Sequence, residues 1–253
     1  MASEAVSSVE RALRLMEALL SGPETVTVLA NKLGIGKATA FRLAQTLKAN
    51  DYVVQLDDSR YQLGPRCMAL AATAAGNIDA RRDLRWALEE LNQRTSETAL
   101  LSVLAGRDAV CIDSITSKQA VVSVATVGEI WPAHTCSAGL AFLADDESFA
   151  ERYLAGPLAQ NTATTVHSPD LLHQMLEQTR IRGYSVNTSY FRDGVCAVGA
   201  LVHDARGQAV AALSVMMPEF RFRESGADHF AAAVTDVCRR ASILLGWRES
   251  SRP

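Results

Sequence analysis

The sequence predicts a mixed α+β protein in which a small helical domain precedes a larger domain with an antiparallel sheet. Apolar residues recur at helical spacing through the first quarter of the chain, whereas strand-like runs joined directly to one another dominate the remainder. An alanine-rich segment between these regions is stopped at Gly76-Asn77. We therefore expect a first domain at 1–64, a linker helix at 65–78 and a second domain at 79–253.

Three helices and a hairpin are expected in the first domain. Apolar residues recur every three or four residues from Val9 to Leu20, which predicts an amphipathic helix. Two further helices follow, one ending at Gly34 and one spanning about 37–49. The segment 52–64 is β-branched or aromatic on both sides of a polar turn, which predicts a β-hairpin.

The second domain is expected to mix helices with antiparallel strands. Its helices are predicted over residues 82–94, 136–144, 146–155, 171–182 and 225–246. Its strands are predicted over residues 99–105, 109–116, 120–126, 194–204 and 208–217. Ser168-Pro169 has the residue types that begin a helix, and Gly183 has the type that ends one.

One segment of the first domain is basic in a chain whose formal net charge is −3. Thr25–Asn50 contains four lysines and arginines and no acidic residue, so any positive field is local to this part. Ala30 and Gly34 have the spacing needed where two helices cross over a tight turn. The outer face of the following helix carries residue types that bind phosphates and base edges, which indicates a DNA-binding winged helix-turn-helix.

The side chains expected to contact DNA lie on these helices and on the hairpin. They are Thr27, Lys37, Thr39, Arg42, Gln45, Lys48 and Arg60. Lys37, Thr39, Arg42 and Gln45 are expected to enter the major groove, and Lys48 and Arg60 to hold phosphates. The alternatives are a small helical domain whose basic face is only solvated, and a module that docks protein instead of DNA.

Cysteine and histidine usage gives no sign of a metal or cofactor site. The five cysteines are scattered without a Cys-x-x-Cys pair, and no two histidines are four residues apart. The first 21 residues do not have the pattern of a signal peptide, and no apolar run approaches the roughly 18 residues of a membrane span. We expect a soluble, cytoplasmic protein without cofactors or bound metal.

Five segments resemble, in order, the IclR family of bacterial transcriptional regulators. They are SSVERALRLMEALL (7–20), LANKLGIGKATAFRLAQTLKANDYV (29–53), SRYQLGPR (59–66), GEIWPAHTCSAGLAFLA (128–144) and the segment 181–218. The resemblance implies a winged helix-turn-helix, a linker helix and a C-terminal effector-binding domain similar to GAF and PAS sensors. It also implies homodimers or homotetramers on palindromic operators, acting as a repressor or an activator.

The departures from the family pattern bear on the effector. Ala38 stands where the family has a serine, and the polar run 187–190 stands where acidic residues are usual. Cys196-Ala197 replaces an Arg-Cys pair. Ser214 matches a pocket serine, whereas Met216 replaces a second small polar residue. A less charged pocket favours an aromatic or otherwise bulky carboxylate over a two- or three-carbon acid.

The helix beginning near Cys136 is expected to bind the effector's carboxylate through its free N–H groups. Asn187 and Ser214 are expected to reach a second polar group, and aromatic residues to wall the ring. The expected effector-binding residues are Trp131, His134, Cys136, Ser137, Ala138, Asn187, Tyr190, Ala197, Ser214 and Met216. Core packing is the alternative role for Tyr190, Phe191 and Met216.

Two other functions use the cysteines. His134 and Cys136 have the residue types of a base and a nucleophile, and a thiol at a helix N-terminus is expected to have a lowered pKa. No third residue that would orient the pair is identifiable, so we expect no enzyme. A redox-responsive regulator acting through Cys136 or Cys196 is the other alternative.

Overall fold

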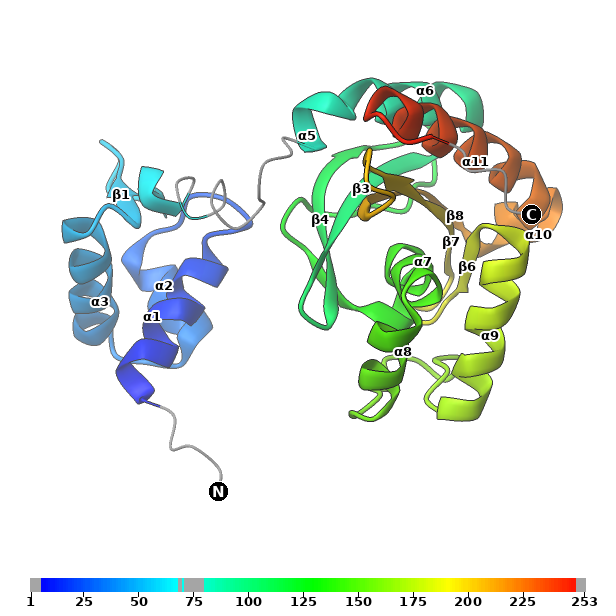
Figure 1. Cartoon of the computed structure of the whole chain (residues 1–253). Coiled ribbons are helices and arrows are strands. Elements are labelled where there is room, and N and C mark those ends of the chain that lie inside the picture. The colour runs from blue at the N-terminus through cyan, green and yellow to red at the C-terminus, as the bar shows by residue number, and fades with distance from the viewer. Residues whose placement is uncertain (1–5, 68–69, 71–79, 249–253) are drawn as a thin grey trace. The chain divides into compact units, whose positions relative to one another are not determined.

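The computed structural model describes residues 6–67, 70 and 80–248 (Figure 1). The chain divides into two compact units, Met1–Asn77 and Ile78–Pro253. Most of the expected linker helix lies outside the described residues, although 65–67 and 70 are helical. None of the helices within the described ranges is both long and apolar enough to cross a membrane.

Within residues 6–64 of the first unit, three helices pack with a two-stranded hairpin. They are α1 (Ser7–Ala18), α2 (Val26–Leu33), α3 (Lys37–Ala49), β1 (Val53–Gln55) and β2 (Tyr61–Leu63). Leu15 of α1, Leu29 of α2 and Tyr61 of β2 are buried in one shared core. Gly34 ends α2 at φ +66°, a left-handed conformation that glycine adopts without steric cost, and this allows the tight turn into α3.

A six-stranded antiparallel sheet forms the second unit, in the order β5-β4-β3-β8-β7-β6. The strands are β3 (Thr98–Ala105), β4 (Asp108–Ile115), β5 (Ile130–Pro132), β6 (Ser185–Thr188), β7 (Val195–His203) and β8 (Ala209–Pro218). The helices are α5 (Ala80–Asp83), α6 (Arg85–Thr95), η1 (Ala133–Thr135), α7 (Ser137–Asp145), α8 (Glu147–Leu154), α9 (Pro169–Arg182), α10 (Glu219–Ser225) and α11 (Ala227–Leu244). The predicted α+β fold class is confirmed.

The two faces of the sheet pack against different helices. Helices α6 and α11 cover one face, and α7 lies against the other (Figure 1). Alternation along β8 sends Leu213 and Val215 into the α6–α11 core, whereas Met216 packs with α7 residues. Consequently the α7 side of the sheet holds the polar and small side chains of β8, which include Ser214.

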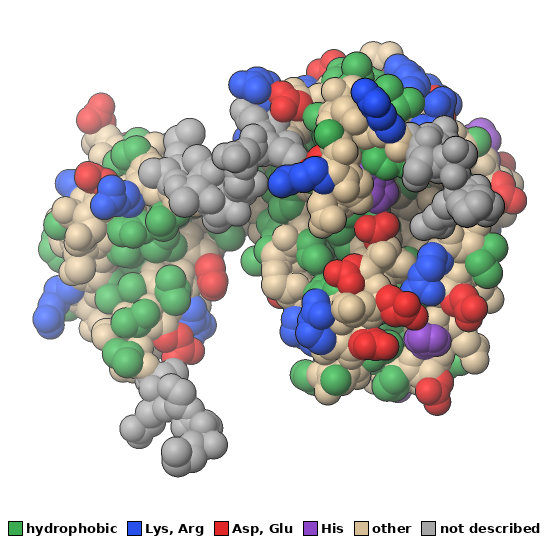
Figure 2. Space-filling view, viewed as in Figure 1, with side chains coloured by type: hydrophobic (Ala, Val, Ile, Leu, Met, Phe, Trp, Pro, Cys, Tyr) green, Lys and Arg blue, Asp and Glu red, His purple; other side chains and the backbone are tan. Residues whose placement is uncertain are grey.

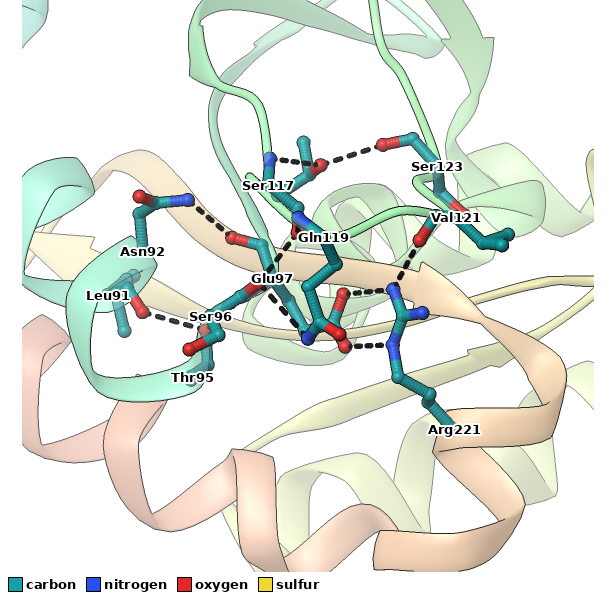
Figure 3. Close-up of polar contacts among 11 residues, drawn as sticks. Leu91, Asn92, Thr95, Ser96, Glu97, Ser117, Gln119, Val121, Ser123 and Arg221 are labelled. Atoms are coloured by element: carbon teal, nitrogen blue, oxygen red, sulfur yellow. Dashed lines mark hydrogen bonds and ion pairs between the residues drawn. The ribbon is translucent and has the colours of Figure 1, made fainter.

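The predicted strand at 120–126 is wrong, and β5 lies a few residues later, at Ile130–Pro132. The backbone of this segment bonds to side chains instead of to a neighbouring strand. The Ser123 carbonyl accepts from Thr98 Oγ1 at 2.7 Å, and the Val121 carbonyl accepts from Arg221 Nη2 at 2.8 Å (Figure 3). These bonds satisfy the carbonyl groups without a β-ladder.

Helix α9 begins after Ser168 as predicted, although the Ser168 side chain makes no capping bond.

Candidate functional site

The exposed side of α3 carries the first candidate site. Lys37, Thr39 and Arg42 are exposed on this helix, and neither basic side chain forms an ion pair with a described residue. Thr27 is exposed on α2. Phe41, which is not among the expected DNA contacts, is 48% exposed beside Arg42. Its position outside the buried stripe of α3 is the signal that marks it as a surface residue.

The remaining predicted DNA contacts are joined to the hairpin. Gln45 Nε2 donates to the Tyr61 hydroxyl at 3.0 Å, and Lys48 Nζ donates to Gln55 Oε1 at 3.1 Å. The Gln45 amide keeps a second N–H and its oxygen for another partner. These two bonds fix the hairpin against α3, so the structure places the helix and the hairpin as one surface.

Arg60 is held within the hairpin turn. Its guanidinium lies 2.6 Å from Asp58 Oδ2, and its backbone N–H donates to Asp58 Oδ1 at 3.1 Å. Hydrogen bonds from the Arg60 backbone and then from its side chain lower the pKa of Asp58. To contact a phosphate, the Arg60 guanidinium must therefore either break its ion pair with Asp58 or bind the phosphate and the Asp58 carboxylate at the same time.

The second candidate site is a cavity between the sheet and the N-terminus of α7. It collects predicted effector residues from β5, α7, β6, β7 and β8, namely Trp131, Cys136, Ser137, Ala138, Asn187, Ala197, Ser214 and Met216. The cavity volume is about 50 Å³. One water molecule needs about 10–15 Å³ by this measure, so the cavity as it stands holds only a few waters.

The N-terminus of α7 supplies the polar end of this cavity. Cys136 caps the helix, because its Sγ accepts from the Gly139 N–H at 3.3 Å. The N–H groups of Ser137 and Ala138 have no acceptor in the described part of the chain. Two N–H groups at a helix N-terminus favour an anion, since the helix dipole adds to their hydrogen bonds.

Two serine hydroxyls lie beside these N–H groups. Ser137 Oγ donates to Ser214 Oγ at 3.1 Å, which joins α7 to the centre of the sheet. Gly199, which pairs with Ser214, permits this contact, because a Cβ there would lie 2.6 Å from Ser214 Oγ and 3.2 Å from Ser137 Oγ. Ser185 Oγ also holds the Ser137 carbonyl at 2.6 Å.

Asn187 lines the cavity, but its amide is committed to the backbone. Its Nδ2 donates to the Thr135 carbonyl at 2.8 Å, and its Oδ1 accepts from the Tyr190 N–H at 2.9 Å. The structure thus gives Asn187 a positioning role, holding the turn before α7 and the loop after β6.

The structure places His134 and Tyr190 away from the cavity, contrary to expectation. His134 is fully buried, with Nδ1 2.7 Å from the Tyr153 hydroxyl and Nε2 2.9 Å from the Ala159 carbonyl. Tyr190 packs against the separate apolar cluster around α8 and α9. Both side chains therefore support the loops around α7, and neither lines the cavity.

Burial changes the expected chemistry of the cysteines. Desolvation raises the pKa of Cys136 to about 12, in spite of its position at a helix N-terminus, and that of Cys196 to about 11. Both ring nitrogens of His134 are already bonded, so the expected base does not face Cys136. A nucleophilic or peroxide-sensitive thiol requires a thiolate, which these environments disfavour. The described residues contain no group of three side chains able to hold a metal ion.

Sequence reasoning proposed Trp131 and Phe191 as walls of the cavity but missed Arg192 and Glu129 at its exposed side, the cavity mouth. Arg192 crosses the mouth from the loop after β6, donating to Glu129 Oε1 at 3.1 Å and to the Val124 carbonyl at 3.4 Å. Beside this pair Phe191 meets Trp131 edge to face, with ring centroids 6.4 Å apart. No local pattern indicates that these two loops lie opposite each other, because the sheet brings them together.

Two family models match the chain, and relatives match along nearly all of it. The IclR helix-turn-helix domain matches residues 8–57, and the bacterial transcriptional regulator IclR C-terminal model matches residues 72–243. The glycerol operon regulatory protein of Streptomyces griseus is 30% identical over 247 residues, 95% of this chain and 97% of that protein. The HTH-type transcriptional regulator KdgR of Escherichia coli is 28% identical over 250 residues, 97% of this chain and 95% of that protein.

A solved structure shows the same fold. The crystal structure of an IclR homologue from Microbacterium hydrocarbonoxydans, complexed with 4-hydroxybenzoate, has a TM-score of 0.75 and 21% sequence identity. The match covers 94% of this chain and 98% of that one. Since the family models match both units, the chain belongs to the IclR family of bacterial transcriptional regulators, whose members are DNA-binding proteins and not enzymes.

Proposed function

We propose that this regulator binds a palindromic operator through α3 and the hairpin, and that an aromatic carboxylate in the α7 cavity controls its operator affinity. One observation carries the effector part of this proposal. The N–H groups of Ser137 and Ala138 have no acceptor among the described residues, and with two serine hydroxyls they line a cavity whose other walls are mainly apolar. A carboxylate would accept hydrogen bonds from these N–H groups, and the apolar remainder of the ligand would pack against the apolar walls.

An aromatic body suits the walls of the cavity. Trp131, Phe191 and Met216 lie on its sides, and each offers a flat or adaptable apolar surface. The small present volume means that binding must displace some of these side chains. A related protein of the same fold has been crystallised with 4-hydroxybenzoate, a compound of this class.

The DNA part of the proposal assigns roles by exposure. Lys37, Thr39 and Arg42 are free to enter the major groove, and Phe41 is placed to contact a thymine methyl group. Lys48 and Arg60 are proposed to hold phosphates, and Gln45 to reach a base with its remaining amide groups. Thr27 of α2 is proposed to contact the backbone where α2 crosses it.

A homodimer fits a palindromic operator, because each half-site then meets one copy. Helix α1 offers a surface for this contact. Val9 and Leu13 on α1, with Val6 before it and Leu20 after it, are apolar side chains with exposures from 47% to 65%. Hydrophobic side chains gather on the visible face of the first unit in Figure 2. Burying these side chains against a second copy would remove them from water.

The test of the effector is a thermal-shift comparison of acids with their amides. Benzoate, pyruvate and hexanoate would each be compared with the neutral amide, using the full-length protein. An acid at about 100 times its dissociation constant adds roughly 2.7 kcal/mol of stability. We expect a shift with benzoate and none with benzamide, since the amide lacks the charge that the α7 N-terminus favours. A shift only with the short or aliphatic acids would reject the aromatic assignment.

The test of the DNA surface is Arg42→Ala, with Arg152→Ala on the second unit as the matched control. If Arg42 reads a base, operator affinity falls by about 1–3 kcal/mol and discrimination is lost at one position of the half-site. The control should bind as the unchanged protein does. Equal operator affinity in both variants would remove Arg42 from the proposed surface.

A further inference from the structure

The cavity contains a polar group that no contact with the described part of the chain explains. Ser102 lies on β3, lines the cavity and is 1% exposed. Among the described residues, its Oγ is the buried side-chain oxygen or nitrogen that has no hydrogen-bond partner. Buried hydroxyls in folded proteins are nearly always bonded, so this one indicates a partner from outside the chain.

The position of Ser102 relative to the proposed carboxylate site follows from the sheet register. Strand β3 pairs with β8 so that Leu100 lies opposite Ser214 and Ser102 lies opposite Ala212. Ser102 and Ser214 are therefore diagonal neighbours on one face, a relation that separates residues by about 7–8 Å. Ser214 is bonded to Ser137 at the α7 N-terminus, so the cavity has one polar end there and a second at Ser102.

The surface between these two polar ends is apolar. Leu100 of β3 lies opposite Ser214 and two residues before Ser102. Ala138 and Met216 also line the cavity near these residues. A ligand that spans the cavity therefore meets a polar group, an apolar stretch and a second polar group. An aromatic ring with two polar substituents that are not adjacent matches this arrangement, because the ring is the apolar part and each substituent meets one polar end.

We propose that Ser102 is a specificity-determining residue that hydrogen-bonds a hydroxyl group of the effector, which is then a hydroxylated aromatic acid. The hydroxyl lies meta or para to the carboxylate, because an ortho hydroxyl stays beside the carboxylate at the α7 end. This inference rests on the proposed aromatic carboxylate effector and names its class more narrowly.

The preference for a hydroxylated acid has a direct physical cause. Ser102 Oγ both donates and accepts, so a phenol satisfies it in either direction. In the ligand-free cavity, water can serve as its partner. An acid without the hydroxyl displaces that water and replaces it with a C–H group, which leaves Ser102 buried and unpaired. The unsubstituted acid is therefore bound more weakly than its hydroxylated analogue.

The experiment measures dissociation constants of benzoate, 3-hydroxybenzoate and 4-hydroxybenzoate by calorimetry on the full-length protein. Ser102→Ala is the test variant, and Ser242→Ala is the matched control, because Ser242 is equally buried but bonded to Cys238 and His203 away from this cavity. One hydroxybenzoate should bind the unchanged protein more tightly than benzoate by on the order of tenfold or more. That ratio should persist in Ser242→Ala and fall to near one in Ser102→Ala.

Ligand-free stability is the second readout. Removing an unpaired hydroxyl should leave the melting temperature unchanged or raise it, whereas Ser242→Ala loses two bonds and should melt lower. A marked loss of stability in Ser102→Ala would mean that the hydroxyl is structural and would overturn the inference. So would equal binding of benzoate and both hydroxybenzoates, or a hydroxyl preference that survives in Ser102→Ala. Binding of the short or aliphatic acids alone would instead reject the proposed function on which the inference rests.

Discussion

His134 shows how one buried side chain can position a binding site without lining it. The Ala159 carbonyl only accepts, so the His134 Nε2 carries the proton and Nδ1 accepts from the Tyr153 hydroxyl. Arg107 packs over the same tyrosine ring, 4.0 Å from its centroid. This neutral imidazole fixes the turn that leads into α7, and with it the direction of the helix N-terminus.

The buried imidazole predicts a pH dependence of stability. Desolvation lowers the pKa of His134 from its ordinary value of 6.5. Below that pH the unfolded chain binds a proton that the folded chain does not, so the free energy of unfolding falls as pH falls from 6.5 through the lower folded-state pKa. We expect urea unfolding to show this loss, and His134→Gln to reduce it. Identical pH slopes for both proteins would contradict the prediction.

The cysteines predict resistance to oxidation. With pKa values raised to about 12 and about 11, Cys136 and Cys196 remain thiols at neutral pH. Iodoacetamide should label them only after unfolding, and half-buried Cys67 serves as the comparison within the same sample. Peptide mass spectrometry measures the labelling. Labelling of either residue in the folded protein at the rate of Cys67 would revive the redox-responsive alternative.

At the scale of elements, local signals decided which segments were predicted correctly. The bounds of α3 were expected within a residue, because Gly34, a change of period and the apolar spacing are all readable in sequence. The segment 120–126 was mistaken for a strand because its backbone partners, Thr98 and Arg221, are distant in sequence. Ser102 was missed for the same reason, since its place near Ser214 depends on the β3–β8 register.

Arg192, in the loop between β6 and β7, is expected to control how fast a bound ligand leaves the cavity. Arg192 closes the cavity mouth through Glu129, but the two side chains are 55% and 21% exposed. A pair this exposed contributes about 0–1 kcal/mol to stability, so its main effect is on access. We expect Arg192→Ala to raise the dissociation rate of a bound aromatic acid, measured by stopped-flow tryptophan fluorescence. Arg206→Ala, which breaks the ion pair of exposed Arg206 with buried Asp204 in the β7–β8 turn, should leave that rate unchanged. Equal rates in the two variants would exclude a gating role.

At the scale of the whole molecule, ion pairs connect the cavity to the start of the second unit. Trp131 on β5 pairs with Ala109 on β4, and β4 carries the buried Asp113. Asp113 accepts two bonds from Arg85 of α6, at 2.9 and 3.0 Å, and lies 3.7 Å from Arg81 of α5. Helix α5 is the first described element after the segment between the units. A displacement of the cavity wall can therefore reach this helix through continuous contacts.

A second ion pair, between Glu97 and Arg221, holds the segment that leads into the cavity wall. Glu97, 2% exposed, binds Arg221 of α10 through both carboxylate oxygens, and Arg221 also holds the Val121 carbonyl (Figure 3). The segment held in this way continues into Val124 and Ala125, which line the cavity. Arg221 of α10 thus joins Glu97, the residue before β3, to the segment that supplies part of the cavity lining.

These contacts predict that ligand binding and its effect on DNA are separable. Asp113→Asn keeps the shape of the side chain but removes the charge that holds Arg85 and Arg81. We expect the acid's dissociation constant to change little, since Asp113 does not line the cavity. The ratio of operator affinities with and without the acid should move towards one, because coupling requires an element that both sites bias. Fluorescence anisotropy of labelled operator DNA measures this ratio.

The control and a second variant make this prediction decisive. Asp236→Asn removes an exposed partner of Arg94 on the α6–α11 surface and should leave the ratio unchanged. Removing one partner of a buried pair can cost about 3–5 kcal/mol, so Arg85→Gln tests the same contact from its exposed side, where the cost is smaller. If both Asp113→Asn and Arg85→Gln fold and respond to the acid as the unchanged protein does, the effector signal does not pass through β4 and α6. If both bind acid and operator but lose the response, Asp113 joins the cavity to the DNA-binding half of the chain.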